Sequence, residues 1–120
     1  MGLRRALTRI GLSGRKWVVD MLTVSELTKK LTPIFDANGV TKAIVFGSYA
    51  KGYATEKSDI DIMVDTEDWV RGLNFVGLIG EVADCLDMDV DLIAKRSIKP
   101  GSRIASSIEQ EGQVIYDNPR

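Results

Sequence analysis

The stretch IVFGSYAKGYATEKSDIDIMV, residues 44–64, decides how the rest of the chain is interpreted. It begins with a short apolar run that stops at Gly47 and Ser48, and it ends with two aspartates that alternate with isoleucines. Residues two apart in a strand lie on the same face of a sheet. Asp59 and Asp61 are therefore expected to project together, and two carboxylates this close repel each other unless a cation lies between them.

The flanking residues predict one small α/β (α+β) domain, in which helices cover a mixed β-sheet. Thr23 and Glu26 have the spacing of a capping box, and the helix that they begin is expected to stop at Gly39. Pro33 should bend or shorten that helix. Apolar periodicity predicts helices over residues 24–38, 69–86 and 102–110, and strands over residues 40–46, 59–65, 87–94 and 114–116.

A basic extension precedes this domain. Residues 1–20 carry five Lys or Arg against Asp20, whereas the whole chain has a formal net charge of -1. We therefore divide the chain into residues 1–21, a basic extension of uncertain role, and residues 22–118, the folded domain. The extension is either an extra basic helix or an upstream segment ahead of a start at Met21, and a transit peptide is a weaker alternative.

The composition narrows the chemistry that is available. The chain has no histidine, so acid-base or metal chemistry must use carboxylates, lysines and backbone groups. Oxygen ligands of this kind favour Mg²⁺, Mn²⁺ or Ca²⁺ over zinc. The single cysteine, Cys85, fits a reducing cytoplasm, and no apolar run is long enough for a membrane span. The small net charge predicts no direct binding to nucleic acid.

A third carboxylate is expected beside Asp59 and Asp61. The later strand alternates Asp87, Asp89 and Asp91 with apolar residues, which places these acids on one face. Asp91 is the best candidate, because apolar residues flank it on both sides and so place it well inside the strand. An exposed acidic strand face is the alternative for an Asp-x-Asp pair taken alone.

A phosphate cradle is expected next to these acids. Gly47 permits a close backbone approach at the end of a buried strand, and exposed N–H groups with the Ser48 hydroxyl can hold phosphate oxygens. Lys51 adds a positive charge in the same turn. The combination of cradle and acids is what favours an active site over a solvated strand face.

At this point the sequence resembles a known family. Gly47-Ser48, ten residues and then Asp59-x-Asp61 resemble the signature of the polymerase-beta-like nucleotidyltransferases. The longer string over residues 46–61 is similar to the minimal nucleotidyltransferase (MNT) branch, whose members are often antitoxins of HEPN toxins. The resemblance extends over about residues 22–118. Asp91 lies in a segment that resembles the third-carboxylate strand of the family, and residues 104–116 resemble its closing helix and strand.

This resemblance implies an enzyme that transfers AMP from ATP to a hydroxyl and releases pyrophosphate. It implies that Asp59, Asp61 and Asp91 are the catalytic residues and bind two Mg²⁺ ions, and that Gly47 and Ser48 hold the donor phosphates. The acceptor would be a tyrosine hydroxyl of a partner HEPN toxin. Lys51 stands where the family commonly has arginine, so it loses the bidentate fork of a guanidinium.

Two other functions stay open from the sequence. The domain could neutralise a partner by binding alone, without catalysis. It could also be a small-molecule nucleotidyltransferase that works as a homodimer, with an acceptor pocket between its subunits. The sequence leaves open the donor base, the acceptor, the oligomeric state and the activity of the site.

Overall fold

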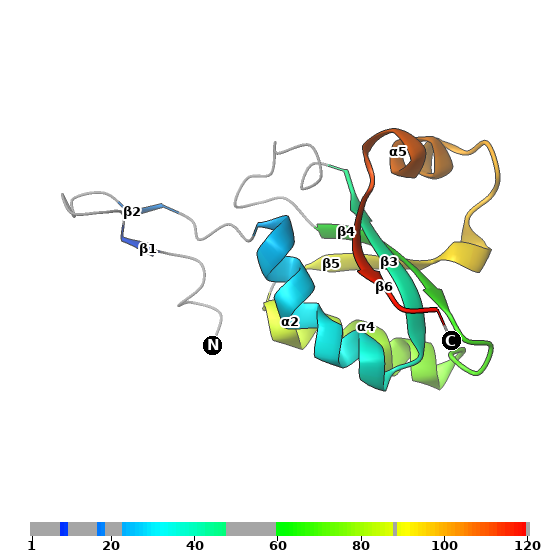
Figure 1. The fold of residues 1–120 in the computed structure, drawn as a ribbon, viewed down its shortest axis with the longest axis horizontal. Coiled ribbons are helices and arrows are strands. Elements are labelled where there is room, and N and C mark those ends of the chain that lie inside the picture. The colour runs from blue at the N-terminus through cyan, green and yellow to red at the C-terminus, as the bar shows by residue number, and fades with distance from the viewer. Residues whose placement is uncertain (1–7, 10–16, 19–22, 48–59, 88, 120) are drawn as a thin grey trace.

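A four-stranded mixed sheet forms the centre of the molecule (Figure 1). The computed structural model describes residues 8–9, 17–18, 23–47, 60–87 and 89–119. In chain order the elements are β1 (Thr8–Arg9), β2 (Trp17–Val18), α2 (Val24–Ala37), β3 (Val40–Phe46), β4 (Ile60–Thr66), α4 (Leu73–Leu86), β5 (Val90–Ala94), the 3-10 helix η1 (Lys95–Ser97), α5 (Arg103–Glu111) and β6 (Gln113–Asp117).

The strand order β5-β4-β3-β6 confirms the predicted mixed sheet. β4 runs antiparallel to β3 and parallel to β5, and β6 pairs antiparallel with the other edge of β3. The parallel pair is possible because α4 crosses between β4 and β5. The two central strands, β3 and β4, are consecutive in the chain; Gly47 directly follows β3, and Asp61 lies in β4.

Helices α2 and α4 lie side by side on one face of the sheet and enclose the main core (Figure 1). In β4, every second residue points into this layer, namely Ile60, Ile62 and Val64, and the residues between them face the other side of the sheet. The fully buried side chains of this core are Leu27, Leu31, Phe35, Val40, Ala43, Val45, Ile60, Ile62, Val64, Val70, Leu78, Val82 and Leu86.

The start of α2 is formed as predicted. The backbone N–H of Glu26 donates to Oγ1 of Thr23 at 3.0 Å, and the N–H of Thr23 donates to Oε1 of Glu26 at 2.8 Å. The helix passes through Pro33 without being shortened and ends before Gly39, whose φ of +74° provides the left-handed stop. Of the two predicted effects of the proline, shortening is therefore wrong, and bending stays a prediction.

The start of α4 lies later than predicted. The polar residues 65–68 do not cap the helix; they complete β4 and form turns, and α4 begins only after Gly72. Gly72 supplies no side-chain cap, and its φ of +57° explains why the chain turns there. Polar residues such as 65–68 commonly precede a helix, which is why the predicted start is residue 69, but they also favour turns.

The strand that follows α4 is shorter than predicted. Asp87 is not in a strand; it is the left-handed C-cap of α4, with a φ of +54° and its N–H bonded to the Ala83 carbonyl. Asp89 precedes β5, and its carbonyl accepts a hydrogen bond from the N–H of Ile60 at 3.2 Å. Of the three alternating acids, only Asp91 lies within the strand.

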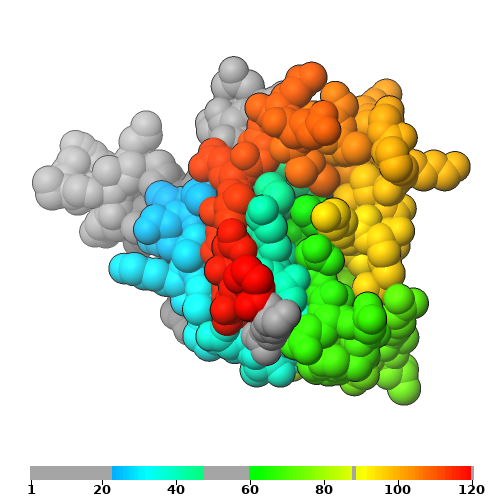
Figure 2. Space-filling view, turned by 45° about the vertical axis from the view of Figure 1, so that its right-hand side comes forward, coloured from blue at the N-terminus to red at the C-terminus, as the bar shows by residue number. Residues whose placement is uncertain are grey.

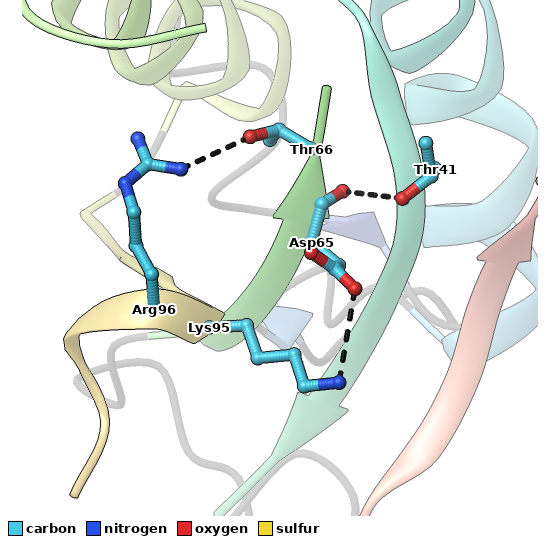
Figure 3. Close-up of polar contacts among 5 residues, drawn as sticks. All are labelled: Thr41, Asp65, Thr66, Lys95 and Arg96. Carbon is cyan, nitrogen blue, oxygen red and sulfur yellow. Dashed lines mark hydrogen bonds and ion pairs between the residues drawn. The ribbon is translucent and has the colours of Figure 1, made fainter. Parts of the chain in front are cut away.

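Polar contacts join η1, which directly follows β5, to the C-terminal end of β4 (Figure 3). Nη1 of Arg96 donates to Oγ1 of Thr66 at 3.2 Å, and Nη2 donates to the Val70 carbonyl at 2.7 Å. The Lys95 ammonium lies 3.8 Å from the Asp65 carboxylate in a largely exposed ion pair, which contributes little stability by itself. This network lies at the opposite end of β4 from Asp61.

The other face of the sheet carries α5. Figure 2 shows β6, β3 and β4 beside one another, with α5 and the segment after β5 next to them. Gly112 ends α5 in close contact with the sheet, since a Cβ there would lie 2.7 Å from Cγ2 of Ile44. Phe46 and Met63 are buried on this face, outside the main core. Ile104 of α5 is 38% exposed.

The described residues before Met21 form a two-stranded ladder. Thr8 pairs with Val18 and Arg9 pairs with Trp17 in antiparallel register. These four residues are strand, so the prediction of a basic helix is wrong for them. No helix among the residues that the structure describes is long and apolar enough to cross a membrane.

Candidate active site

Asp61 and Asp91 lie next to each other on neighbouring parallel strands. Each is the second residue of its strand, and the two are direct register partners in the β4–β5 ladder. Their neighbours Ile60 and Leu92 point into the core, so both aspartates project from the opposite face. Adjacent strands are about 4.8 Å apart, which brings the two side chains close enough to act on one group.

The two carboxylates differ in environment. Asp61 belongs to a central strand between β3 and β5 and is half-buried, whereas Asp91 belongs to the edge strand and is exposed. Across the β3–β4 ladder, Asp61 is paired with Phe46, the last residue before the glycine turn. The site therefore opens toward solvent on the side of β5.

Gly47 is fitted against Asp61. It follows β3 with a φ of +75°, and a Cβ at this position would lie only 2.5 Å from Oδ2 of Asp61. That separation is shorter than any normal carbon–oxygen contact, so no side chain fits here while the carboxylate keeps its position. The glycine has two roles in this geometry, because it permits the left-handed turn and leaves room for the acid.

The remaining predicted site residues lie outside the described residues. These are Ser48, Lys51 and Asp59. Asp59 directly precedes Ile60, the first residue of β4, and Ser48 directly follows Gly47. The structure thus brings together Gly47, Asp61 and Asp91 of the six predicted residues.

The described part of the site suits a hard divalent cation. Asp61 and Asp91 present only carboxylate oxygens, the ligand type that Mg²⁺ prefers, and a cation between them would remove the repulsion of like charges. Among the residues that the structure describes, no group of three or more His, Cys, Asp or Glu is placed to hold a metal ion. Asp59, the predicted third carboxylate, lies outside the described residues.

The steric fit between Gly47 and Asp61 was not apparent from the sequence. The glycine predicts a tight turn and a close approach of phosphate, but its distance to a residue fourteen positions later depends on the β3–β4 register. The apolar outer face of α4 was also missed. The sequence pattern that indicates this face is the helical spacing of apolar residues and glycines on the side opposite the core residues, namely Leu73, Val76, Gly77 and Gly80.

The fold and the site together define a class of protein. The structure has a small mixed sheet with paired aspartates beside a glycine turn. This is the arrangement expected from the resemblance of the sequence to the nucleotidyltransferases. The family model described as "Polymerase beta, Nucleotidyltransferase" matches residues 29–120. This chain belongs to that family.

Relatives in sequence cover most of the domain. Protein adenylyltransferase MntA of Thermococcus cleftensis is 39% identical over 100 residues, which are 80% of this chain and 97% of that protein. MJ0128 of Methanocaldococcus jannaschii is also 39% identical over 100 residues, covering 80% of this chain and 99% of that protein.

Solved structures share the fold. A toxin–antitoxin crystal structure with AMP-PNP aligns with a TM-score of 0.65 and 27% identity, over 76% of this chain and 73% of that chain. A tri-AMPylated Shewanella oneidensis HEPN toxin in complex with its MNT antitoxin aligns with a TM-score of 0.60, over 80% of this chain and 74% of that chain. At 23% identity the second likeness shows the fold alone.

Proposed function

We propose that this protein transfers AMP from ATP to a tyrosine hydroxyl of a HEPN-type toxin and so acts as the antitoxin of that partner. The observation that carries the proposal is the placement of Asp61 and Asp91 side by side, with Gly47 fitted against Asp61. The relative from Thermococcus cleftensis, named as a protein adenylyltransferase, supports the reaction. The toxin–antitoxin structure with AMP-PNP supports the nucleotide and the kind of partner.

In this proposal Gly47 and Ser48 hold the terminal phosphates of ATP, and Lys51 supplies a positive charge to their oxygens. The acceptor oxygen forms a bond to the α-phosphorus while the bond from that phosphorus to the bridging oxygen breaks, and pyrophosphate leaves. Asp91 receives the proton of the hydroxyl, since it is the exposed member of the pair and the acceptor can reach it.

Asp59, Asp61 and Asp91 are the residues that would hold two Mg²⁺ ions. When bound, such ions supply charge stabilisation to the attacking and leaving oxygens of an in-line displacement. The half-buried Asp61 would be fixed in place by the Gly47 turn, so its oxygens need little reorganisation during the reaction. We place the reaction in the cytoplasm, where ATP is available and Cys85 stays reduced.

The test is an AMP-transfer assay on the complex of this protein with the partner that copurifies with it. Labelled ATP and Mg²⁺ should give a labelled partner, and mass spectrometry should locate the AMP on a tyrosine. Asp61→Asn and Asp91→Asn should each lower the rate by at least about a hundredfold. Asp65→Asn is the matched control, because it removes a carboxylate from the same face of β4 at the far end of the strand.

Three outcomes would contradict the proposal. If the partner carries no AMP and Asp61→Asn still neutralises it, the protein works by binding alone. If the purified protein modifies a small hydroxyl compound without any partner, the acceptor is not a toxin. Equal loss of activity in Asp65→Asn would show that the acid pair of β4 and β5 is not the reacting site.

A further inference from the structure

The outer face of α4 is apolar and exposed. Leu73 is 88% exposed, Val76 is 60% exposed and Trp69, in the turn before the helix, is 51% exposed. Residues 72–80 contain no charged side chain. The core of α4 lies on the opposite side of the helix, where Leu78, Val82 and Leu86 are fully buried, so the packing of this domain does not account for the outer face.

Two glycines continue this outer face. At 3.6 residues per turn, Gly77 and Gly80 share one side of the helix with Leu73 and Val76. A glycine inside a helix costs about 1 kcal/mol relative to alanine. Among the described residues nothing lies within 4 Å of a Cβ placed at either glycine. The domain itself therefore gains no packing from the two notches that the glycines leave.

We propose that the outer face of α4 docks a second copy of this chain, through an antiparallel pairing of the two α4 helices about a two-fold axis. In such a pairing one patch contacts itself. The register that places Leu73 of one copy against Gly80 of the other also places Val76 against Gly77. Each large apolar side chain then meets a glycine notch, which allows the helices to approach closely.

The charges at the two ends of the helix fit the same register. Arg71 precedes the helix, and its Nε donates to the Asp68 carbonyl at 3.0 Å. An antiparallel partner brings the last turns of its own α4 to this position, where Glu81 and Asp84 are exposed. In this register Arg71 of each copy lies near Asp84 of the other. Glu81 also accepts a hydrogen bond from Asn38 of its own chain, and Asp68 adds a negative charge beside Arg71. The Arg71–Asp84 contact occurs at both ends of the pair and the centre is uncharged, which favours a second copy.

The position of the acids argues against the proposed toxin as the occupant. α4 covers the core face of the sheet, whereas Asp61 and Asp91 project from the opposite face. A protein docked on the outer side of α4 would be separated from the acids by the helix and the sheet. A second copy on that side leaves both acid sites open. The surface is small, so the association is expected to be weak.

Sedimentation of the full chain without any partner, from micromolar to near-millimolar concentration, tests the pairing. The wild type should pass from monomer to dimer. Val76→Glu should raise the dissociation constant at least about tenfold, because it places a charge in the apolar centre. Val114→Glu is the matched control, since Val114 is 51% exposed on β6, and it should leave the dissociation constant unchanged.

Three further variants test the notch and the charge contact. Gly80→Leu should raise the melting temperature of the monomer, because leucine favours a helix and meets open space there, yet weaken the dimer by about tenfold by filling the notch. Arg71→Glu should weaken the dimer, and Arg71→Glu with Asp84→Arg should restore it.

Three results would overturn the inference. The first is a wild-type protein that stays monomeric throughout. The second is a dimer that Val76→Glu and Gly80→Leu leave unchanged, which would place the interface elsewhere. The third is a monomeric wild type whose copurifying partner no longer binds Val76→Glu, which would assign the face to that partner. None of these results depends on AMP transfer, so they are separate from a failure of the proposed function.

Discussion

Replacing Gly47 with alanine should remove AMP transfer while the fold survives. A Cβ at this position would lie 2.5 Å from Oδ2 of Asp61. Non-bonded carbon and oxygen atoms need roughly 3.2–3.5 Å, so the carboxylate must move by roughly 0.7–1 Å. A displacement of this size in a reacting group can lower the rate by about a hundredfold. We expect a loss of that order.

The cost to stability should be small. An alanine at a φ of +75° carries about 1–2 kcal/mol of backbone strain, and the atom that must give way is the end of a side chain rather than backbone. For a domain of this size, such a loss lowers the melting temperature by roughly 5–15 °C. A folded but inactive protein is therefore the expected product, and circular dichroism with a thermal melt checks the fold.

Gly101→Ala is the matched control. Gly101 has a φ of +78°, and nothing lies within 4 Å of a Cβ placed there, so the same backbone strain arises without any contact to a carboxylate. Both variants should lose similar stability, but only Gly47→Ala should lose activity. The Mg²⁺ concentration for half-maximal activity should rise in Gly47→Ala if Asp61 is a metal ligand. Gly47→Ala with activity within about threefold of Gly101→Ala would refute the positioning argument.

Three other predictions concern ligand binding and stability. Mg²⁺ with ATP at about 100 times the dissociation constant should stabilise the wild type by about 2.7 kcal/mol and raise its melting temperature. Asp59→Asn should reduce this rise. An equal rise in the wild type and in Asp59→Asn would exclude Asp59 as a ligand. Arg96→Ala should lower the melting temperature by about 4–8 °C, because it removes the hydrogen bonds to Thr66 Oγ1 and to the Val70 carbonyl. AMP transfer should be unchanged, because this network lies at the far end of β4. Thr23→Ala should cost about 1 kcal/mol in a denaturant melt through the lost N-cap, and Ser25→Ala, one position into the helix, should cost less.

Local patterns in the sequence predicted most of the elements. The capping box at Thr23 and the glycine after Asn38 place both ends of α2, and the apolar run 43–46 lies in β3. These signals are local, because the residues that form each cap or strand are also the residues that carry the pattern. The pairing of Asp61 with Asp91 required one further step, namely that two strands joined by a helix become neighbours.

The errors arose where two local patterns compete. Residues 65–68 are polar enough to begin a helix, but β4 extends through Thr66 and the turn after it delays α4 until Leu73. Asp87 continued the alternation of acids, yet the end of α4 uses it as a left-handed cap. In both cases the position of the neighbouring element decides the outcome, and alternation over a few residues contains no information about that position.

The two faces of the sheet have different roles in this small domain. Ile60, Ile62 and Val64 are buried against α2 and α4, so this face supplies the core. The residues between them face the other way, and the first of these is Asp61. Because alternation along one strand supplies both the core and an acid of the site, Asp61 cannot shift by one residue in register without exposing the core. The packing that stabilises the domain therefore also fixes the acid pair, and an acceptor hydroxyl has to approach from the face opposite α2 and α4.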